Sequence, residues 1–218
     1  MLKKLILKRK QKKLDKFLYN NREVSLYIGM PRSGKTTYIA YLTKLCNDCG
    51  KRVFCNVPII GAIPFEKEDL GKFDMSNSVI LLDEAGIMYD NRNFKDGFTK
   101  ESLKFLKLLG HYKSNVALFS QSMDIDLKWV RMSTNIFMIK KSIIPGFTSM
   151  SMIKRYLDVD ENTHQIVDFF EKPTGLLKKI FKFRFWRKPY YKLFNSWDAP
   201  NLPPMKNQTP YSSKAGVL

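Results

Sequence analysis

Short apolar runs alternate with amphipathic segments along the middle of the chain. The runs have the length and apolar content of buried strands, and they cover residues 24–28, 51–57, 79–84, 115–119 and 135–140. Two segments between them, 36–48 and 101–109, carry apolar residues at helical spacing. Strand–helix–strand units favour a right-handed crossover between parallel strands. The pattern therefore predicts an α/β fold with a mostly parallel central sheet flanked by helices.

Patterning outside these runs is less regular. Residues 59–74 are predicted to form a connection with a short helix around 67–70. A short helix is expected over 124–131, and 150–159 and 163–170 are predicted to be extended pieces that complete one edge of the sheet.

The stretch between the first strand and the first helix reads Gly29-Met30-Pro31-Arg32-Ser33-Gly34-Lys35-Thr36. It fits G-x-x-x-x-G-K-[ST], the phosphate-binding P-loop, and it has the flanking strand and helix that the motif requires. Backbone N–H groups at such a turn converge on one point and attract anions. We therefore predict that Gly29 to Thr37 bind the phosphates of ATP, with Lys35 reaching the β- and γ-phosphates. Thr36 would hold Mg²⁺.

Two acids, Asp83 and Glu84, follow the apolar run 79–82. Such a run suits a strand buried on both faces of a parallel sheet, and acids at its carboxyl end emerge where these sheets bind ligands. This Walker B pattern, downstream of a P-loop, predicts that Asp83 fixes Mg²⁺ and that Glu84 acts on the attacking water as general base. Two solvent-facing acids at a strand end are the plainer alternative.

The strand predicted over 115–119 ends in Ser120-Gln121-Ser122. A polar side chain in this position can touch the γ-phosphate or the attacking water. We assign this sensor role to Gln121, with Ser120 as the second choice; a serine that caps a turn or a helix is the alternative. The predicted catalytic residues are thus Lys35, Glu84 and Gln121.

The chain carries 38 basic and 20 acidic residues, a net charge of +18, which suggests an anionic partner. Residues 1–22 form a basic amphipathic arm, and in 172–197 basic residues interleave with aromatic ones. Both flanks suit nucleic-acid phosphates or an anionic membrane surface. A solvated tail and a β-hairpin with aromatics in the core are the plainer explanations. The remaining segments are an ATPase core over 23–171 and a tail over 198–218 that we expect to be disordered.

No apolar run approaches the roughly 18–20 residues of a membrane-spanning helix, and charges interrupt the N-terminal apolar residues, unlike a signal peptide. We therefore expect the protein on the cytoplasmic side. Cys46 and Cys49 have C-x-x-C spacing but no second pair follows, and both histidines are remote. Together with Cys55 they are predicted to be reduced thiols rather than zinc ligands.

Several of these stretches together resemble the zonula occludens toxin-like (Zot-like) ATPases, which are related to the assembly ATPase of filamentous phages and to FtsK/HerA-type motors. The stretches are residues 29–36, Arg52-Val53-Phe54-Cys55-Asn56-Val57-Pro58, Ile80-Leu81-Leu82-Asp83-Glu84-Ala85-Gly86, His111-Tyr112-Lys113 with Phe119-Ser120-Gln121-Ser122, and Tyr191-Lys192-Leu193-Phe194-Asn195-Ser196. The resemblance implies a P-loop NTPase of RecA/FtsK-HerA-like build with ATP and Mg²⁺ as cofactors. It also implies a homo-oligomeric ring, for which a hexamer is one expected size, and phage DNA as the partner.

The chain departs from that family in two ways. The family usually has Arg before its His, whereas Gly110 precedes His111 here. A charge-neutralising role of that Arg would then pass to Lys113, Arg92 or Arg131, or to another subunit. The filamentous-phage proteins also carry a transmembrane helix after the ATPase domain, and none is predicted in this sequence.

The leading hypothesis is an ATP-hydrolysing motor that moves phage DNA during virion assembly, extrusion or genome packaging. ATP is favoured over GTP because no guanine-reading Asn-Lys-x-Asp motif is present. The expected location is the host cytoplasm, with contacts to the anionic membrane face, to phage membrane or coat proteins, or to the virion vertex. The alternative is a nucleotide-dependent scaffold on the membrane surface without motor activity. A small-molecule kinase is disfavoured because no Arg-rich lid is visible.

Overall fold

The computed structural model describes residues 2–20, 23–66, 69–84, 100–121, 133–159, 166–171 and 182–195. Its central element is a nine-stranded sheet with the strand order β3-β2-β4-β5-β1-β6-β7-β8, in which β9 also pairs with β7. The strands are β1 (Val24–Ile28), β2 (Arg52–Cys55), β3 (Ile63–Pro64), β4 (Ser78–Leu82), β5 (Asn115–Ser120), β6 (Ser133–Lys141), β7 (Phe147–Val159), β8 (Ile166–Glu171) and β9 (Lys182–Trp186). The described helices are α1 (Leu2–Asn20), α2 (Lys35–Asp48), α4 (Lys100–Lys107) and the 3₁₀ helix η2 (Lys188–Leu193).

Every adjacent pair of strands from β3 to β6 in this order is parallel. β5 lies between β1 and β4, because residues 116–120 of β5 pair with β1 and residues 115–118 pair with β4. The carboxyl ends of these three strands therefore meet at one edge of the sheet. This arrangement confirms the predicted α/β fold with a mostly parallel sheet.

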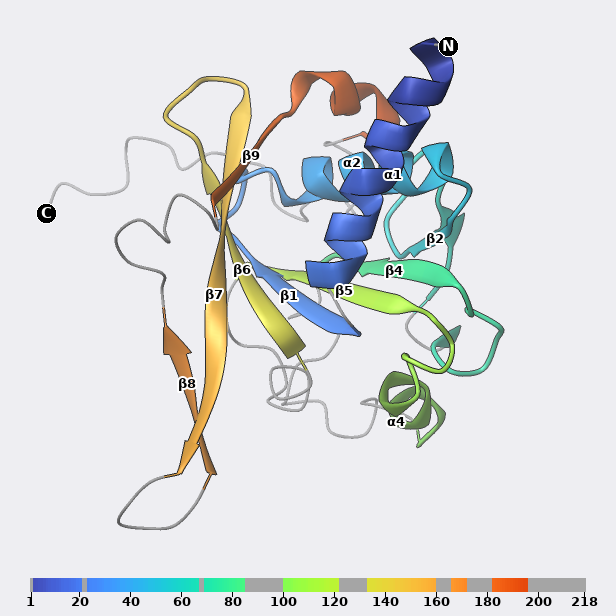
Figure 1. Cartoon of the computed structure of the whole chain (residues 1–218), viewed down its shortest axis with the longest axis vertical. Coiled ribbons are helices and arrows are strands. Elements are labelled where there is room, and N and C mark those ends of the chain that lie inside the picture. Colours follow the sequence, from blue (N-terminus) through green and yellow to red (C-terminus); the bar gives the residue numbers. More distant parts are fainter. Residues whose placement is uncertain are drawn as a thin grey trace, which may run out of the picture.

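The other side of the sheet is antiparallel and built around β7. The first part of β7 pairs with β6 and β9, and its last six positions, residues 154–159, pair with β8. Figure 1 shows the β7–β8 pair projecting away from the parallel strands. The predicted extended pieces over 150–159 and 163–170 overlap β7 and β8. β8 ends the strand order, whereas β7 pairs on both sides, and residues 163–165 lie outside the described residues. β9 lies within the basic aromatic segment.

Side chains alternate between the two faces of the sheet, as the pleat requires. Tyr27 of β1 packs in a cluster with apolar residues of α1 and α2, and Leu26 packs in a second cluster with α4. Figure 1 shows α1 and α2 together on one face and α4 on the other. Both faces of the central strands are thus covered, which explains why their sequences are continuously apolar.

The basic N-terminal segment forms α1, and its second half packs on the core. Leu14 and Phe17 are buried in the cluster that contains α2, and Lys10 Nζ lies 2.8 Å from Asp48 Oδ2 at the end of α2. The first half exposes three consecutive apolar side chains to solvent: Leu5, Ile6 and Leu7. One helix therefore combines a docked half with an exposed basic and apolar half.

One strand of the structure was not predicted, and two predicted segments fall outside the described residues. β3 was not predicted as a strand, because it is two residues long and contains a proline, which suits only an edge position. The helix predicted over 124–131 and the tail over 198–218 lie outside the described residues.

Candidate functional site

The residues predicted to act on a nucleotide gather where β1, β4 and β5 end. Gly29 follows β1, Asp83 follows β4, and Gln121 follows β5. The Gly29 N–H donates to Ser120 O across 3.0 Å, which joins the start of the loop to the last residue of β5. Parallel strands open such a crevice at their carboxyl ends, where α/β proteins bind ligands.

The loop between β1 and α2 has the backbone of a phosphate-binding turn. The Ser33 N–H donates to Met30 O across 3.1 Å, and Gly34 has a φ of 103°, a conformation that favours glycine. The Tyr38 N–H then donates to Gly34 O at the first turn of α2. The N–H groups at the start of this helix have no helical partner and are suited to bind an anion.

The side chain of Lys35, the first residue of α2, points back onto the loop that precedes the helix. Its side chain is buried, with 6% of the residue exposed, and Nζ donates to Gly29 O across 3.0 Å. A buried ammonium group needs such acceptors, since its desolvation is costly. Phosphate oxygens in the same space would be stronger acceptors than a single carbonyl.

Thr36 and Asp83 join the loop to β4. Thr36 Oγ1 donates to Asp83 Oδ2 across 3.0 Å, and the Glu84 N–H donates to Asp83 Oδ1 across the same distance. Burial raises the pKa of Asp83, an effect that the nearby Glu84 strengthens and the Thr36 hydrogen bond opposes. A hydroxyl and a buried carboxylate are oxygen ligands of the kind that Mg²⁺ prefers, so these two residues fit the metal.

Asn56, one residue beyond β2, holds the backbone of Asp83 from the opposite side. Its Nδ2 donates to Asp83 O across 3.0 Å, and its Oδ1 accepts from the Asp83 N–H across 2.7 Å. This two-point contact fixes the direction in which the carboxylate points. The sequence interpretation gave Asn56 no role in the site; its polar side chain near the end of the strand predicted over 51–57 was the available signal.

Glu84 and Gln121 contact each other across the end of the sheet. Gln121 Nε2 donates to Glu84 Oε1 across 2.8 Å, and Glu84 has a positive φ of 51°. This conformation is uncommon for a residue with a side chain, and such outliers cluster at functional sites. Ser120, the second sensor choice, is buried, and its carbonyl oxygen accepts a hydrogen bond from the Gly29 N–H.

A second group of contacts supports the loop from β6 and β7, and no motif indicated it. Thr148 Oγ1, fully buried on β7, donates to Ser33 O across 3.1 Å. A Cβ at Gly29 would lie 2.8 Å from the carbonyl oxygen of Ile139, and one at Gly34 would lie 2.4 Å from Thr148 Oγ1. Both glycines are therefore required by close packing against β6 and β7.

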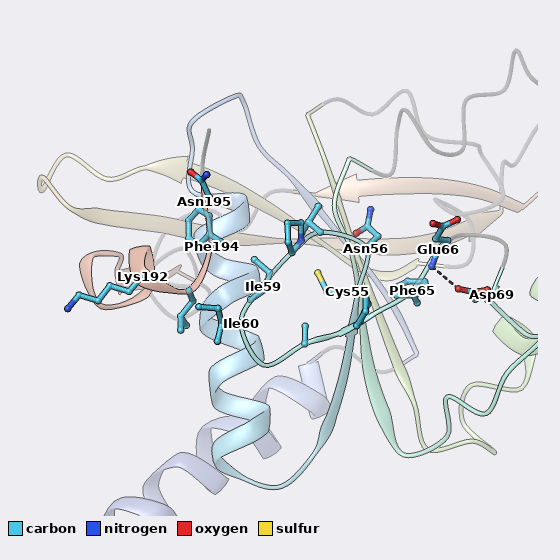
Figure 2. Close-up of a pocket in the computed structure, with 15 residues that line it drawn as sticks. Cys55, Asn56, Ile59, Ile60, Phe65, Glu66, Asp69, Lys192, Phe194 and Asn195 are labelled. Carbon is cyan, nitrogen blue, oxygen red and sulfur yellow. Dashed lines mark hydrogen bonds between the residues drawn. The ribbon is translucent and has the colours of Figure 1, made fainter. Parts of the chain in front are cut away.

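A pocket of about 1060 Å³ opens at the carboxyl end of β2. Figure 2 shows Glu66 and Asp69 at one end of it and Lys192, Phe194 and Asn195 at the other. Asn56 also lines this pocket. The pocket and Asp83 thus share one side chain, so a displacement of Asn56 in the pocket would move the carboxylate.

Lys113 does not fit the charge-neutralising role that the sequence interpretation allowed it. It precedes β5, at the amino end of the strand, whereas Gln121 follows the carboxyl end. A strand of this length separates the two by about 20 Å, so Lys113 cannot reach the same subunit's loop. Arg92 and Arg131 lie outside the described residues.

The cysteines do not form a metal site within the described ranges. No group of three potential metal-ligating His, Cys, Asp or Glu side chains occurs there, and Cys46, Cys49 and Cys55 carry free thiols. Burial raises the pKa of Cys46 and of Cys55 to about 12, which makes both thiols unreactive at neutral pH.

Among the helices that the structure describes, none has the length and apolar character of a membrane-spanning helix.

No protein-family model and no curated protein matches the sequence, but solved structures do. The N-terminal domain of zonular occludens toxin from Neisseria meningitidis is 15% identical, with 79% of this chain and 98% of that chain covered and a TM-score of 0.45. B204, the DNA-packaging ATPase from Sulfolobus Turreted Icosahedral Virus, is 13% identical, with coverages of 72% and 100% and a TM-score of 0.46.

The genome packaging NTPase B204 from Sulfolobus turreted icosahedral virus 2, in complex with ATP-gammaS, is 11% identical, with coverages of 71% and 100% and a TM-score of 0.45. The matching structures thus include a Zot domain, the group that the sequence motifs resemble, and viral packaging ATPases. The likeness is distant at these identities, so the roles of individual residues rest on the geometry of the site.

Proposed function

We propose that this chain is an ATPase and that ATP hydrolysis drives the movement of phage DNA during virion assembly, extrusion or genome packaging. The hydrolase part is supported chiefly by the 3.0 Å hydrogen bond from Thr36 Oγ1 to Asp83 Oδ2, which joins the phosphate-binding loop to the acid after β4. The DNA part is supported by the resemblance of the sequence motifs and by the net charge of +18.

In this proposal the loop residues 29–37 bind the triphosphate through backbone N–H groups. Lys35 exchanges the Gly29 carbonyl for phosphate oxygens, and Thr36 and Asp83 hold the metal. Mg²⁺, when bound, neutralises charge on the β- and γ-phosphate oxygens. In the proposed step the oxygen of the attacking water bonds to the γ-phosphorus, the bond from that phosphorus to the bridging oxygen of the departing ADP breaks, and Glu84 takes one proton from the water.

Gln121 is proposed to position Glu84 rather than to act alone. Its amide holds Glu84 Oε1, which leaves the other carboxylate oxygen to accept the proton of the water. The same amide lies at the end of β5, between the loop and Asp83. In this proposal Gln121 responds when the γ-phosphate leaves.

The proposal is tested by ATP turnover of the wild type and of Lys35→Ala, each with no DNA, with single-stranded DNA and with double-stranded DNA. We expect turnover in the wild type, stimulation by DNA and no turnover in Lys35→Ala. Lys44→Ala, on the exposed side of the same helix, is the matched control and should keep wild-type turnover. Undiminished turnover in Lys35→Ala, or none in the wild type under any condition, would refute the ATPase proposal.

The kind of DNA that stimulates turnover separates the two motor roles. Stimulation by double-stranded DNA favours packaging, and stimulation by single-stranded DNA favours extrusion. DNA affinity should fall steeply with added salt if the basic flanks contact phosphates. A mass measurement in the presence of nucleotide tests the proposed homo-oligomeric ring.

A second candidate function, a nucleotide-dependent scaffold on an anionic membrane, is favoured by the exposed half of α1. Three apolar residues, Leu5, Ile6 and Leu7, are about half exposed among lysines and an arginine, as in helices that lie in a membrane interface. Flotation with anionic vesicles tests it. Vesicle binding without ATP turnover at any DNA concentration would favour the scaffold over the motor.

A further inference from the structure

Arg187 lies at a fixed place beside the phosphate-binding loop. It follows β9 and precedes η2. Its N–H donates to Gly146 O across 2.9 Å, and its carbonyl accepts from the Tyr190 N–H across 2.9 Å. Two hydrogen bonds therefore anchor its backbone.

The side chain of Arg187 packs against Gly34. Its Cδ lies 3.2 Å from the position that a Cβ of Gly34 would occupy. Gly34 immediately precedes Lys35 and α2, so its neighbourhood is the part of the loop that binds phosphate in the proposed function. The sequence interpretation placed this residue only in a basic aromatic extension, far along the chain from the loop.

The guanidinium of Arg187 has an unused donor. Its Nε is buried and finds no hydrogen-bond partner among the described residues. Buried polar groups are nearly always paired in native proteins, and an unpaired one calls for an explanation such as a ligand that the structure does not include. A phosphate oxygen is the acceptor that an arginine fork matches best.

We propose that Arg187 is a nucleotide-binding residue, which donates from its guanidinium to the phosphates of a nucleoside triphosphate held by the loop of the same subunit. This inference rests on the proposed function and deepens it. It supplies a cation in cis, a role that Lys113, at the amino end of β5, does not fill. It also gives the C-terminal segment a part in the nucleotide site.

The plainer alternative is that only the aliphatic stem of Arg187 matters, as packing on Gly34. Arg187→Met separates the two, because methionine keeps an unbranched stem but has no donor. Arg184→Met is the matched control: Arg184 lies on β9, three residues before Arg187, but is exposed. Arg187→Lys keeps the charge and loses the fork, so it should recover part of the lost affinity.

The experiment measures the dissociation constant of the magnesium complex of ATP-gammaS at fixed salt, with thermal unfolding as a second readout. We expect Arg187→Met to weaken binding about ten- to a hundredfold, as loss of hydrogen bonds to a charged group does. Arg187→Lys should fall between it and the wild type, and Arg184→Met should bind as the wild type does.

The outcomes distinguish this inference from the proposed function. Wild-type affinity in Arg187→Met, with or without a lower unfolding temperature, would overturn the role of Arg187 while leaving the ATPase proposal intact. Loss of affinity in Lys35→Ala but not in Arg187→Met would have the same meaning. If the wild type itself does not bind ATP-gammaS, both proposals fail.

Discussion

Two regions of the molecule surround the same loop and differ in how they are encoded. The carboxyl ends of β1, β4 and β5 present residues that belong to recognisable sequence motifs, chiefly Lys35, Asp83 and Glu84. The antiparallel strands β7 and β9 with η2 contribute Thr148 and Arg187, which belong to none. Nevertheless Thr148 is fully buried against the loop, and Arg187 packs on Gly34.

The difference follows from what each region does. Groups that act on a nucleotide need fixed chemistry at fixed spacing, so their pattern is visible in the sequence. Groups that support a loop need only the right shape and one hydrogen bond, and several residue types at many chain positions could provide these. Variants in the first region should therefore reduce turnover, whereas variants in the second should act on stability and affinity.

The largest effect is expected for Glu84→Gln. The amide is isosteric but cannot accept the proton of the attacking water, so kcat should fall about 10²- to 10⁴-fold. ATP binding should persist, because the loop and Asp83 are unchanged. Steady-state turnover together with equilibrium binding of ATP checks this, with Glu66→Gln, an exposed carboxylate at the edge of the pocket, as control. Unchanged kcat would remove Glu84 as the base.

Asn56→Ala should have the next largest effect. It leaves the Asp83 N–H and carbonyl without the partners at 2.7 and 3.0 Å, and unmade hydrogen bonds of partly buried groups cost about 1–3 kcal/mol. We expect a lower free energy of unfolding and weaker Mg²⁺-dependent ATP binding. Chemical denaturation measures the first. Asn47→Ala, which removes an exposed hydrogen bond to Gly61 O, should change neither quantity appreciably.

Thr148→Val tests the antiparallel region directly. Valine has nearly the shape of threonine but cannot donate to Ser33 O, so the free energy of unfolding should fall by about 1 kcal/mol. Affinity for ATP should fall by no more than about tenfold, while kcat at saturating ATP stays close to that of the wild type. Thr148→Ser, which keeps the hydroxyl, is the control. A large loss of kcat would show that this region takes part in the chemistry.

Gln121→Ala should have the smallest effect of the four. Its hydrogen bond to Glu84 is exposed, and such a bond contributes about 0.5–1.5 kcal/mol at most. We expect kcat to fall a few-fold with little change in stability. Gln11→Ala, which removes an exposed hydrogen bond to Asp15 in α1, is the matched control. A loss as large as that of Glu84→Gln would make Gln121 a direct participant in the reaction.

Much of the parallel half of the fold could be read from the sequence for a physical reason. The runs that became β1, β4 and β5 are apolar on both faces because helices cover both sides of the sheet. A glycine at position 34 favours the positive φ found there. Lys35 and Thr36 follow it directly and therefore lie at the start of α2. The residues of the loop between β1 and α2, and the acids after β4, could therefore be predicted from the local sequence pattern.

Only the tertiary structure decided which distant residues complete the site. Asn56 reaches Asp83 because β2 lies beside β4, Gln121 reaches Glu84 because β5 lies between β1 and β4, and Arg187 reaches Gly34 because β9 pairs with β7. Strand order is a long-range property, and a side chain such as that of Arg187 carries no local mark of it. The sequence by itself determined the residue types of the loop and of the strand ends; the order of the strands decided which distant side chains hold them in place.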